Sequence, residues 1–393
     1  MTRKLKLAFI VQRYGLEVNG GAEFHCRLLA EHLSKHYDVE IITTCAKDYV
    51  TWKNEYDPGK DIINNIVVWR FPVDFSRDGA VDIQFGKLSE KIFKYYHSIG
   101  DEINWIKLQG PYSVQLLNFI KDKKYEYDYF IFFTYLYFPT VYGLYLVRDK
   151  AILVPTAHDE PPIYLSIFEP LFKMPKIIAY NTEEEKKFIN LKFKNDDIMS
   201  DIIGVGIQKI DNIDDNDFKR KYNVDKFIIY VGRIDESKGC KELVEHFIRF
   251  KQETKCDIKL VLVGKSVMDI PKHPDIITPG FISEQDKYNG IKASELLISP
   301  SRYESLSMIL MEAWLCDKAV LVNGNCEVLK GQCIKSNGGL YYTNYDEFKE
   351  CLNMLLEDIR LRYIMGKNGS KYVKDNYDWD IIEKKYERLL RVI

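Results

Sequence analysis

The chain has 393 residues, which is long for one domain and typical of two. Its 56 basic and 58 acidic residues leave a net charge of −2, so the overall charge does not indicate a nucleic-acid partner. The eight cysteines are scattered and form no Cys-x-x-Cys pair, which argues against a disulfide framework or a zinc site and is typical of a reducing, cytoplasmic compartment.

Apolar runs alternate with segments of helical period along the whole chain. The run after Lys6 is only about five residues long, so we expect a first strand there and no signal peptide. In the first half, strands are predicted at 7–11, 39–43, 66–70, 129–133, 151–154 and 176–180. In the second half they are predicted at 227–231, 258–263, 276–278, 296–299 and 319–322. Because the apolar runs are continuous, they predict parallel sheets covered on both faces.

Residues 129–147 carry no charge and are almost long enough to span a membrane. The segment is rich in tyrosine and contains Pro139, so we expect a buried strand, a loop and a short helix that ends near Asp149. The alternative, a spanning helix, is disfavoured by this composition.

A domain boundary is predicted where residues 201–207 give way to the polar run 209–217. We therefore expect an α/β protein with two Rossmann-like domains, 1–205 and 206–376, facing each other across a cleft. Residues 377–393 have helical period with an apolar stripe that begins at Trp379, and they predict a final helix.

Two segments of the first half are candidate sites. Gly20 and Gly21, in the sequence Asn-Gly-Gly-Ala-Glu after the first strand, permit close approach of a ligand to the backbone before a helix at 24–33. The spacing is not Gly-x-Gly-x-x-Gly, so NAD binding is weakly supported. His158 follows a strand end, where it is either catalytic or structural, and Asp159 could orient it or the acceptor.

Two segments of the second half carry the stronger signals. Arg233 and Lys238 follow a strand in a loop that runs from Gly232 to Gly239, and two cations there can neutralise a diphosphate. Further on, Glu304 precedes a helix predicted at 306–315, and Glu312 lies two turns inside it. Ser305 or Ser307 is expected to be the N-cap, with the first amides of the helix open to a phosphate.

Together these segments resemble retaining GT-B glycosyltransferases of the glycosyltransferase family 4 type. Glu304 and Glu312 match the E-x7-E motif, and Arg233 with Lys238 match the diphosphate clamp. The resemblance implies that His158, Glu304, Arg233 and Lys238 are catalytic. It also implies a donor site made by the residues Gly20, Gly21, Gly232, Phe281, Ile282, Ser305, Leu306, Ser307, Met308 and Glu312. Relatives often have glycine where this chain has Ser305, so the loop geometry can differ.

The resemblance implies transfer of a sugar, with retention, from a nucleotide-diphosphate donor to a glycan, lipid-linked or protein-borne hydroxyl. UDP is favoured over GDP as the commonest donor base of the family, and the final helix is expected to cross back to the first domain. No cofactor or metal is expected, because no Asp-x-Asp, His or Cys cluster follows a strand end. The alternatives are a GT-B sugar-nucleotide epimerase or phosphorylase, and a non-catalytic sugar-nucleotide-binding partner of another transferase.

Residues 87–109 mix lysines with aromatic and aliphatic side chains. One interpretation is a basic amphipathic helix in peripheral contact with an anionic membrane, at its inner face. The other is a helix whose apolar stripe packs on its own domain, which Asp101 and Glu102 favour because they interrupt the basic face.

Overall fold

The computed structural model describes residues 3–18, 20–208 and 211–392, and of Val392 the backbone only. The described chain forms two compact units. The first comprises Met1–Val205 and Glu383–Ile393, and the second comprises Gly206–Ile382. Part of the predicted boundary run, 209–210, lies outside the described residues.

The first unit is built on an eight-stranded sheet in the order β3-β4-β2-β1-β5-β6-β7-β8. All neighbouring strands are parallel except β3 and β4. The strands are β1 (Lys6–Ile10), β2 (Asp38–Thr44), β3 (Gly59–Ile63), β4 (Ile66–Phe71), β5 (Tyr129–Phe133), β6 (Ala151–Val154), β7 (Ile177–Tyr180) and β8 (Ser200–Ile202).

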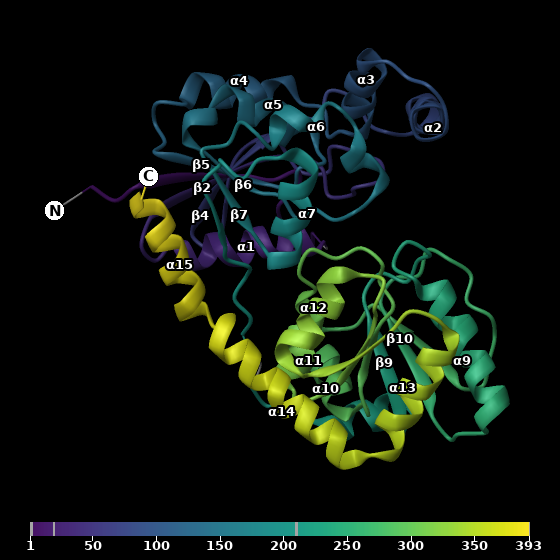
Figure 1. Cartoon of the computed structure of the whole chain (residues 1–393). Coiled ribbons are helices and arrows are strands. Elements are labelled where there is room, and N and C mark those ends of the chain that lie inside the picture. The colour runs from purple at the N-terminus through teal and green to yellow at the C-terminus, as the bar shows by residue number, and fades with distance from the viewer. Residues whose placement is uncertain (1–2, 19, 209–210, 393) are drawn as a thin grey trace. The chain divides into compact units, whose positions relative to one another are not determined.

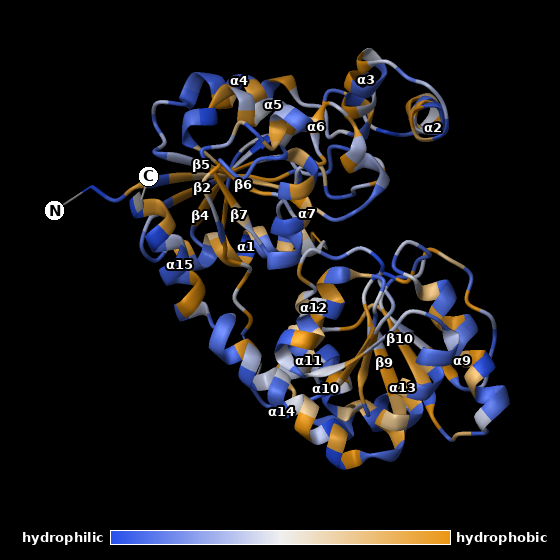
Figure 2. Ribbon diagram, viewed as in Figure 1, coloured by the Kyte–Doolittle hydropathy of each residue, from blue (hydrophilic) through white to orange (hydrophobic). Residues whose placement is uncertain are grey.

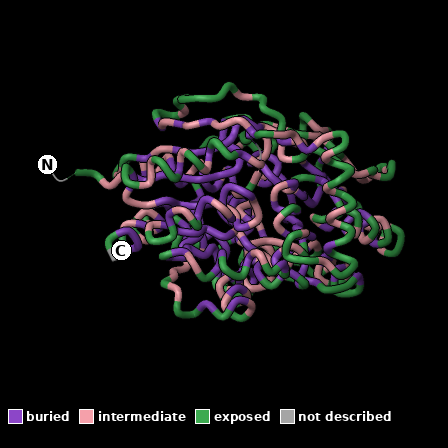
Figure 3. The backbone as a smooth tube through the Cα atoms, turned by 90° about the horizontal axis from the view of Figure 1, so that it is seen from above, coloured by how far each residue is buried: buried purple, intermediate pink, exposed green. Residues whose placement is uncertain are grey.

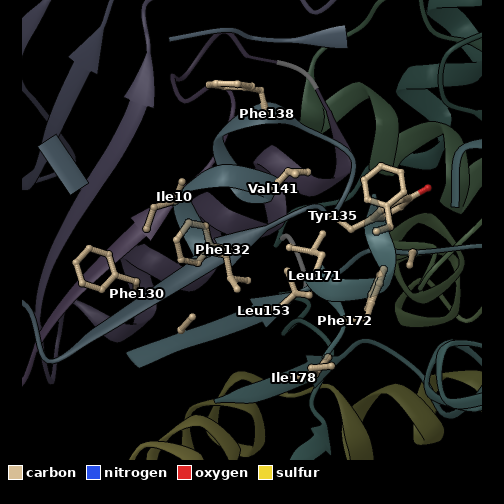
Figure 4. Close-up of a cluster of buried hydrophobic side chains, with 14 of the residues drawn as sticks. Ile10, Phe130, Phe132, Tyr135, Phe138, Val141, Leu153, Leu171, Phe172 and Ile178 are labelled. Atoms are coloured by element: carbon tan, nitrogen blue, oxygen red, sulfur yellow. The ribbon is translucent and has the colours of Figure 1, made fainter. Parts of the chain in front are cut away.

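Helices cover both faces of this sheet (Figure 1), as its continuous apolar strands require (Figure 2). They are α1 (Gly21–Leu33), α2 (Gly79–Lys94), α3 (Ile99–Gln109), α4 (Val114–Lys123), α5 (Phe138–Leu146), α6 (Phe168–Leu171) and α7 (Glu183–Phe193), with 3-10 turns at Arg148–Lys150 and Pro161–Tyr164. Figure 1 shows α1 on one face and α4 and α5 on the other. Figure 4 shows part of the core on the latter side, a cluster that includes Phe130 and Phe132 of β5 and Val141 of α5.

The second unit has a six-stranded, wholly parallel sheet in the order β11-β10-β9-β12-β13-β14. Its strands are β9 (Phe227–Val231), β10 (Lys259–Val263), β11 (Ile276–Gly280), β12 (Leu297–Ser299), β13 (Val320–Asn323) and β14 (Gly339–Tyr342). Its helices are α8 (Asp215–Tyr222), α9 (Cys240–Thr254), α10 (Glu284–Ala293), α11 (Met308–Leu315), α12 (Glu327–Ser336), α13 (Tyr345–Glu357) and α14 (Ile359–Asn376).

The last helix, α15 (Trp379–Val392), begins in the second unit and ends in the first. The apolar stripe of α15 is buried. Along the rest of the chain, too, buried stretches alternate with exposed ones (Figure 3). Two Rossmann-like units of parallel α/β structure are the expected fold class, and the structure confirms it.

All the predicted strands occur, with ends displaced by two residues at most. The sequence did not predict β3, β8 and β14. The β3 segment is mostly exposed and lies at an edge, β8 has three residues, and β14 begins at a glycine, so none shows a long apolar run.

The structure corrects the helix predicted from residues 87–109. Two helices are present, α2 and α3, because Ser98 starts α3 with a capping box in which its side chain and that of Asp101 each accept a backbone N–H. Ile92, Trp105 and Ile106 are buried in the core of their own unit. Residues 129–147 fold as β5, a turn and α5, and none of the described helices is long and apolar enough to cross a bilayer.

Candidate active site

The strongest candidates lie on two loops that begin at adjacent strands of the second unit. One loop follows β9 and the other follows β12, and these strands are neighbours with parallel direction. The loops therefore emerge at the same edge of the sheet, where α/β proteins bind their ligands. They are in contact, because a Cβ on Gly239, which has φ of 75°, would lie 2.2 Å from the carbonyl oxygen of Pro300. Only glycine permits this approach.

Asp235 organises the first loop. One of its carboxylate oxygens accepts hydrogen bonds from the backbone N–H of Lys238 at 2.8 Å and from the hydroxyl of Ser237 at 2.6 Å, and the other pairs with Arg233. Burial opposes the charge of this carboxylate, but these donors outweigh it and lower the pKa of Asp235. Asp235 was not predicted from the sequence. An aspartate three residues before Lys238, in a loop that opens a helix, is the signal that could have identified it.

Lys238 and Glu304 connect the two loops directly. The Lys238 ammonium donates to Glu304 Oε1 at 2.8 Å, and both side chains are partly exposed. Burial opposes the charge of the ammonium, but the Glu304 carboxylate outweighs it and raises the pKa of Lys238. Arg233 lies in the same loop, with Nη2 at 3.4 Å from Ser237 Oγ. The structure thus brings three of the four predicted catalytic residues into one group.

The N-terminus of α11 closes the second loop. The helix begins at Met308 and not at the predicted Leu306, because Ser307 has the left-handed φ of 67°. Ser307 occupies the N-cap position, but its hydroxyl makes no cap hydrogen bond, and this oxygen is buried without a partner among the described residues. Leu306 is buried, whereas Ser305 is partly exposed. The unsatisfied N–H groups that every helix N-terminus carries therefore lie next to an unused hydroxyl.

Glu312 lies in α11 with its carboxylate buried. It pairs with Lys287 of α10 at 2.9 Å, and Lys287 also pairs with Glu284 at 2.7 Å. Glu312 is therefore not part of the Lys238–Glu304 group but pairs with a different cation, Lys287. Lys287 was not predicted from the sequence either, because only the packing of α10 on α11 places it beside Glu312.

The segment predicted to hold the base follows β11. Gly280 of β11 accepts the N–H of Gly264 at 2.9 Å, and a Cβ on Gly264 would clash with the carbonyl oxygen of Gly232. The turns after β9, β10 and β11 are therefore packed backbone against backbone. Phe281 is 71% exposed and Ile282 is partly exposed, so both lie at the surface beside these turns.

Gly20 and Gly21 lie in the first unit, at the start of α1. A Cβ on Gly20 would lie 2.1 Å from Glu23 Oε2, so packing against Glu23 already favours glycine at this position. Glu23 is buried and accepts hydrogen bonds from Gln12 and Arg13, each at 2.9 Å. A Cβ on Gly21 meets nothing within 4 Å. Asn19 of the same motif lies outside the described residues.

His158 also lies in the first unit, in the turn after β6. Its ring Nδ1 is 3.1 Å from Glu160 Oε1, and Glu160 also accepts the hydroxyl of Tyr135 at 2.7 Å. Asp159, which could orient His158 or the acceptor, accepts the hydroxyl of Tyr164 at 2.6 Å. The neighbour of the histidine is therefore Glu160.

Among the described residues, no group of three His, Cys, Asp or Glu side chains is placed to hold a metal ion. The cationic groups of the second-unit site are the side chains of Arg233, Lys238 and Lys287.

Comparison with known proteins agrees with this geometry. Residues 212–372 match the family described as glycosyl transferases group 1. An uncharacterized glycosyltransferase of Methanocaldococcus jannaschii is 25% identical, with 98% of each chain covered. The capsular polysaccharide biosynthesis glycosyltransferase CapM of Staphylococcus aureus is 24% identical over 55% of this chain and 59% of its own. The crystal structure of Anabaena HepE in complex with UDP and glucose superposes with a TM-score of 0.72 at 15% identity, covering 99% of this chain and 100% of HepE.

The two Rossmann-like units, the paired loops and these similarities identify the chain as a glycosyltransferase of the GT-B fold. Its group 1 glycosyltransferase domain lies within the second unit.

Proposed function

We propose that the chain transfers a sugar, with retention of configuration, from a nucleotide-diphosphate donor to a hydroxyl of a glycan, lipid-linked or protein-borne acceptor. The observation that carries the proposal is the contact between Lys238 and Glu304, which joins a cationic loop to an acidic loop beside the start of α11. A diphosphate needs the first group and a sugar hydroxyl needs the second.

The leaving group is a nucleoside diphosphate. Arg233, Lys238 and the N–H groups near Ser305–Met308 stabilise the charge that develops on it. The unpartnered hydroxyl of Ser307 supports this assignment, because a phosphate oxygen is a suitable acceptor for it. In this proposal these groups stabilise the diphosphate without a metal ion.

Glu304 contacts hydroxyls of the donor sugar and Glu312 contacts the ribose. Backbone groups of Phe281 and Ile282 hold the base. In the first unit, Gly20 and Gly21 approach the donor phosphate and His158 touches the transferred sugar. These roles come from the family resemblance, and the positions of the residues at strand ends and at a helix start support them.

UDP is proposed as the donor nucleotide in preference to GDP. HepE, which shares the fold over nearly the full length of both chains, is described as a complex with UDP and glucose. CapM is named for capsular polysaccharide biosynthesis, which supports a glycan acceptor for this chain as well.

Incubation of the purified protein with UDP- and GDP-sugars, without acceptor and then with glycan acceptors, tests this proposal. We expect slow release of one nucleoside diphosphate, faster release with a suitable acceptor, and a product with the anomeric configuration of the donor by NMR coupling constant. Inversion would contradict the retaining assignment. Interconversion of donor sugars would indicate the epimerase alternative. Cleavage that depends on added phosphate would indicate a phosphorylase. Binding of the nucleotide sugar without release of a nucleoside diphosphate would indicate a non-catalytic partner.

Peripheral contact with an anionic membrane at its inner face is proposed for the surface around the end of α2 and the start of α3. Phe93, Tyr95, Tyr96 and Ile99 are exposed there, and Tyr96 is 94% exposed. Lys91 and Lys94 flank them, although each also pairs with a carboxylate, Asp101 and Glu90 respectively. Aromatic side chains beside lysines suit the interface of an anionic bilayer.

Co-sedimentation with liposomes of increasing phosphatidylserine content tests membrane contact. We expect binding that weakens with salt and with the double substitution Tyr95→Ser and Tyr96→Ser. Replacing the exposed Tyr125, which lies on a different segment, provides the control. Absence of binding at low salt would leave an acceptor that is soluble or protein-borne.

A further inference from the structure

The ion pair between Lys287 and Glu312 is unusually enclosed for this protein. Lys287 is 12% exposed and Glu312 is 8% exposed in their side chains. The ammonium lies 2.9 Å from both carboxylate oxygens of Glu312. Glu284, at 2.7 Å from the same ammonium, is largely exposed, so the enclosed part of the contact is the pair itself.

A buried carboxylate keeps its charge only when a partner compensates the lost hydration. Burial raises the pKa of Glu312, and the Lys287 ammonium acts in the opposite direction. Three titratable groups of α10 act on Glu312, namely Lys287, Glu284 and Tyr288, and the hydrogen bond with Tyr288 also lowers its pKa. Only Lys287 among these three is a cation. Among them, Lys287 therefore opposes the effect of burial most strongly.

The hydrogen-bonding capacity of the carboxylate indicates what this pair can do. An ionised carboxylate has about four acceptor positions, two on each oxygen. Because Lys287 contacts each oxygen, acceptor positions remain on both. A vicinal diol, which offers two adjacent O–H donors, matches these two positions. A protonated carboxyl group would lose this symmetry, since one of its oxygens becomes a donor.

We infer that Lys287 is a positioning residue that keeps Glu312 ionised and in place as the acceptor for the two ribose hydroxyls of the donor nucleotide. The inference rests on the proposed function, in which Glu312 contacts the ribose. It makes donor binding selective for ribonucleotides over 2′-deoxynucleotides, and it makes the pH dependence of binding sensitive to the residue at position 287. A purely structural link between α10 and α11 would produce neither property.

Calorimetric titration of the full chain with UDP and 2′-deoxy-UDP, at pH 6, 7 and 8, tests the inference. The variants are Lys287→Met, Lys287→Arg and Glu312→Gln. Lys292→Met is the matched control, because Lys292 also lies on α10 and ties it to the end of α11, through the Cys316 carbonyl at 3.1 Å. Thermal unfolding of each variant separates stability from binding.

We expect the wild type to prefer UDP over 2′-deoxy-UDP by about tenfold or more, since a hydrogen bond to a charged group has that effect. Lys287→Met should abolish the preference and make UDP binding strengthen as pH rises, because Glu312 must then lose its proton before it can accept both hydroxyls. Lys287→Arg should retain most of the preference, and Lys292→Met should retain all of it.

Two outcomes would overturn the inference in different ways. If Glu312→Gln removes the preference but Lys287→Met keeps it, without a new pH dependence, then Lys287 is only structural and the proposed donor site stands. If Glu312→Gln leaves the preference unchanged, or the wild type shows none, then the ribose assignment of Glu312 is wrong and the inference is wrong with it.

Discussion

At the scale of single residues, the two loops of the second unit depend on a small number of charges. Asp235 holds the loop of Arg233 and Lys238, and Lys238 holds Glu304. The sequence identified the cations and Glu304 from their spacing after strand ends. It could not show that Lys238 and Glu304 are in contact, because 66 residues separate them along the chain.

Arg233→Ala and Lys238→Ala should each lower turnover by about a hundredfold or more, because each removes charge stabilisation from the leaving diphosphate. Initial rates of nucleoside diphosphate release measure the effect. Lys241→Ala is the control, since this lysine lies in the first turn of α9, just after the loop, and is exposed. If both loop variants turn over like the control, the diphosphate assignment is wrong.

Gly239 and Gly21 form a contrasting pair at the same scale. Gly239→Ala places a methyl group against the Pro300 carbonyl at a φ of 75°, so we expect a loss of stability of about 1–3 kcal/mol and a fall in activity. Gly21→Ala adds a methyl group where nothing lies within 4 Å, so its stability should match the wild type. Urea unfolding and initial rates measure both variants.

Loss of activity in a fully stable Gly21→Ala protein would support the predicted approach of the donor to this backbone. Full activity would show that Gly21 has no such role. A Gly239→Ala protein as stable as the wild type would contradict the close approach of the two loops.

At the scale of elements, α7 holds the turn that carries His158. Glu185 of α7 is buried and accepts the N–H groups of Ala157 and Asn181, each at 2.6 Å. Thr182 caps the same helix by accepting the N–H of Glu185 at 3.1 Å. The turn after β6 and the start of α7 are thus fixed by one carboxyl group, which accepts the N–H of the residue before His158.

Glu185 predicts a pH dependence of stability. Burial raises its pKa to about 8, although backbone N–H donors oppose this. The folded state therefore holds a proton that the unfolded state, with a pKa of about 4.3, has released. The contribution to the free energy of unfolding is fully present below about pH 4.3 and is lost as pH rises toward 8.

Urea unfolding from pH 5 to pH 9 measures this effect as the difference between the wild type and Glu185→Gln. The free energy of unfolding of the wild type should fall relative to that of the variant up to about pH 8. Above about pH 8 the difference between the two should stay constant. Glu183→Gln, on the exposed face of the same helix, should show no such difference. If the difference in the free energy of unfolding between the wild type and Glu185→Gln does not change with pH, then Glu185 is ionised throughout this pH range.

At the scale of the whole molecule, the second unit carries the group 1 domain and all the cationic groups of the proposed diphosphate site. In the proposed function the first unit contributes His158 and the start of α1, and the chain runs from one unit to the other through α15. We therefore expect activity to need the full chain, and nucleotide binding to depend mainly on residues of the second unit.

Activity should persist after treatment with excess EDTA and dialysis, because lysine and arginine side chains neutralise the diphosphate in the proposed site. Initial rates with and without added Mg²⁺ or Mn²⁺ measure this. Nucleotide affinity, measured in parallel, shows whether any change arises at binding. Abolition by chelation with recovery on adding metal would show that the diphosphate is held in another way.

The sequence alone determined the two parallel α/β halves, most of their strands and the residues that follow those strands. Continuous apolar runs and the spacing of a few charged residues are local properties, so they are readable without a structure. Only the tertiary structure decided which residues meet. The contacts of Lys238 with Glu304, Lys287 with Glu312 and Glu185 with Ala157 join segments 66, 25 and 28 residues apart. Such pairs depend on the order of strands in a sheet and on helix packing, which one-dimensional patterns do not contain.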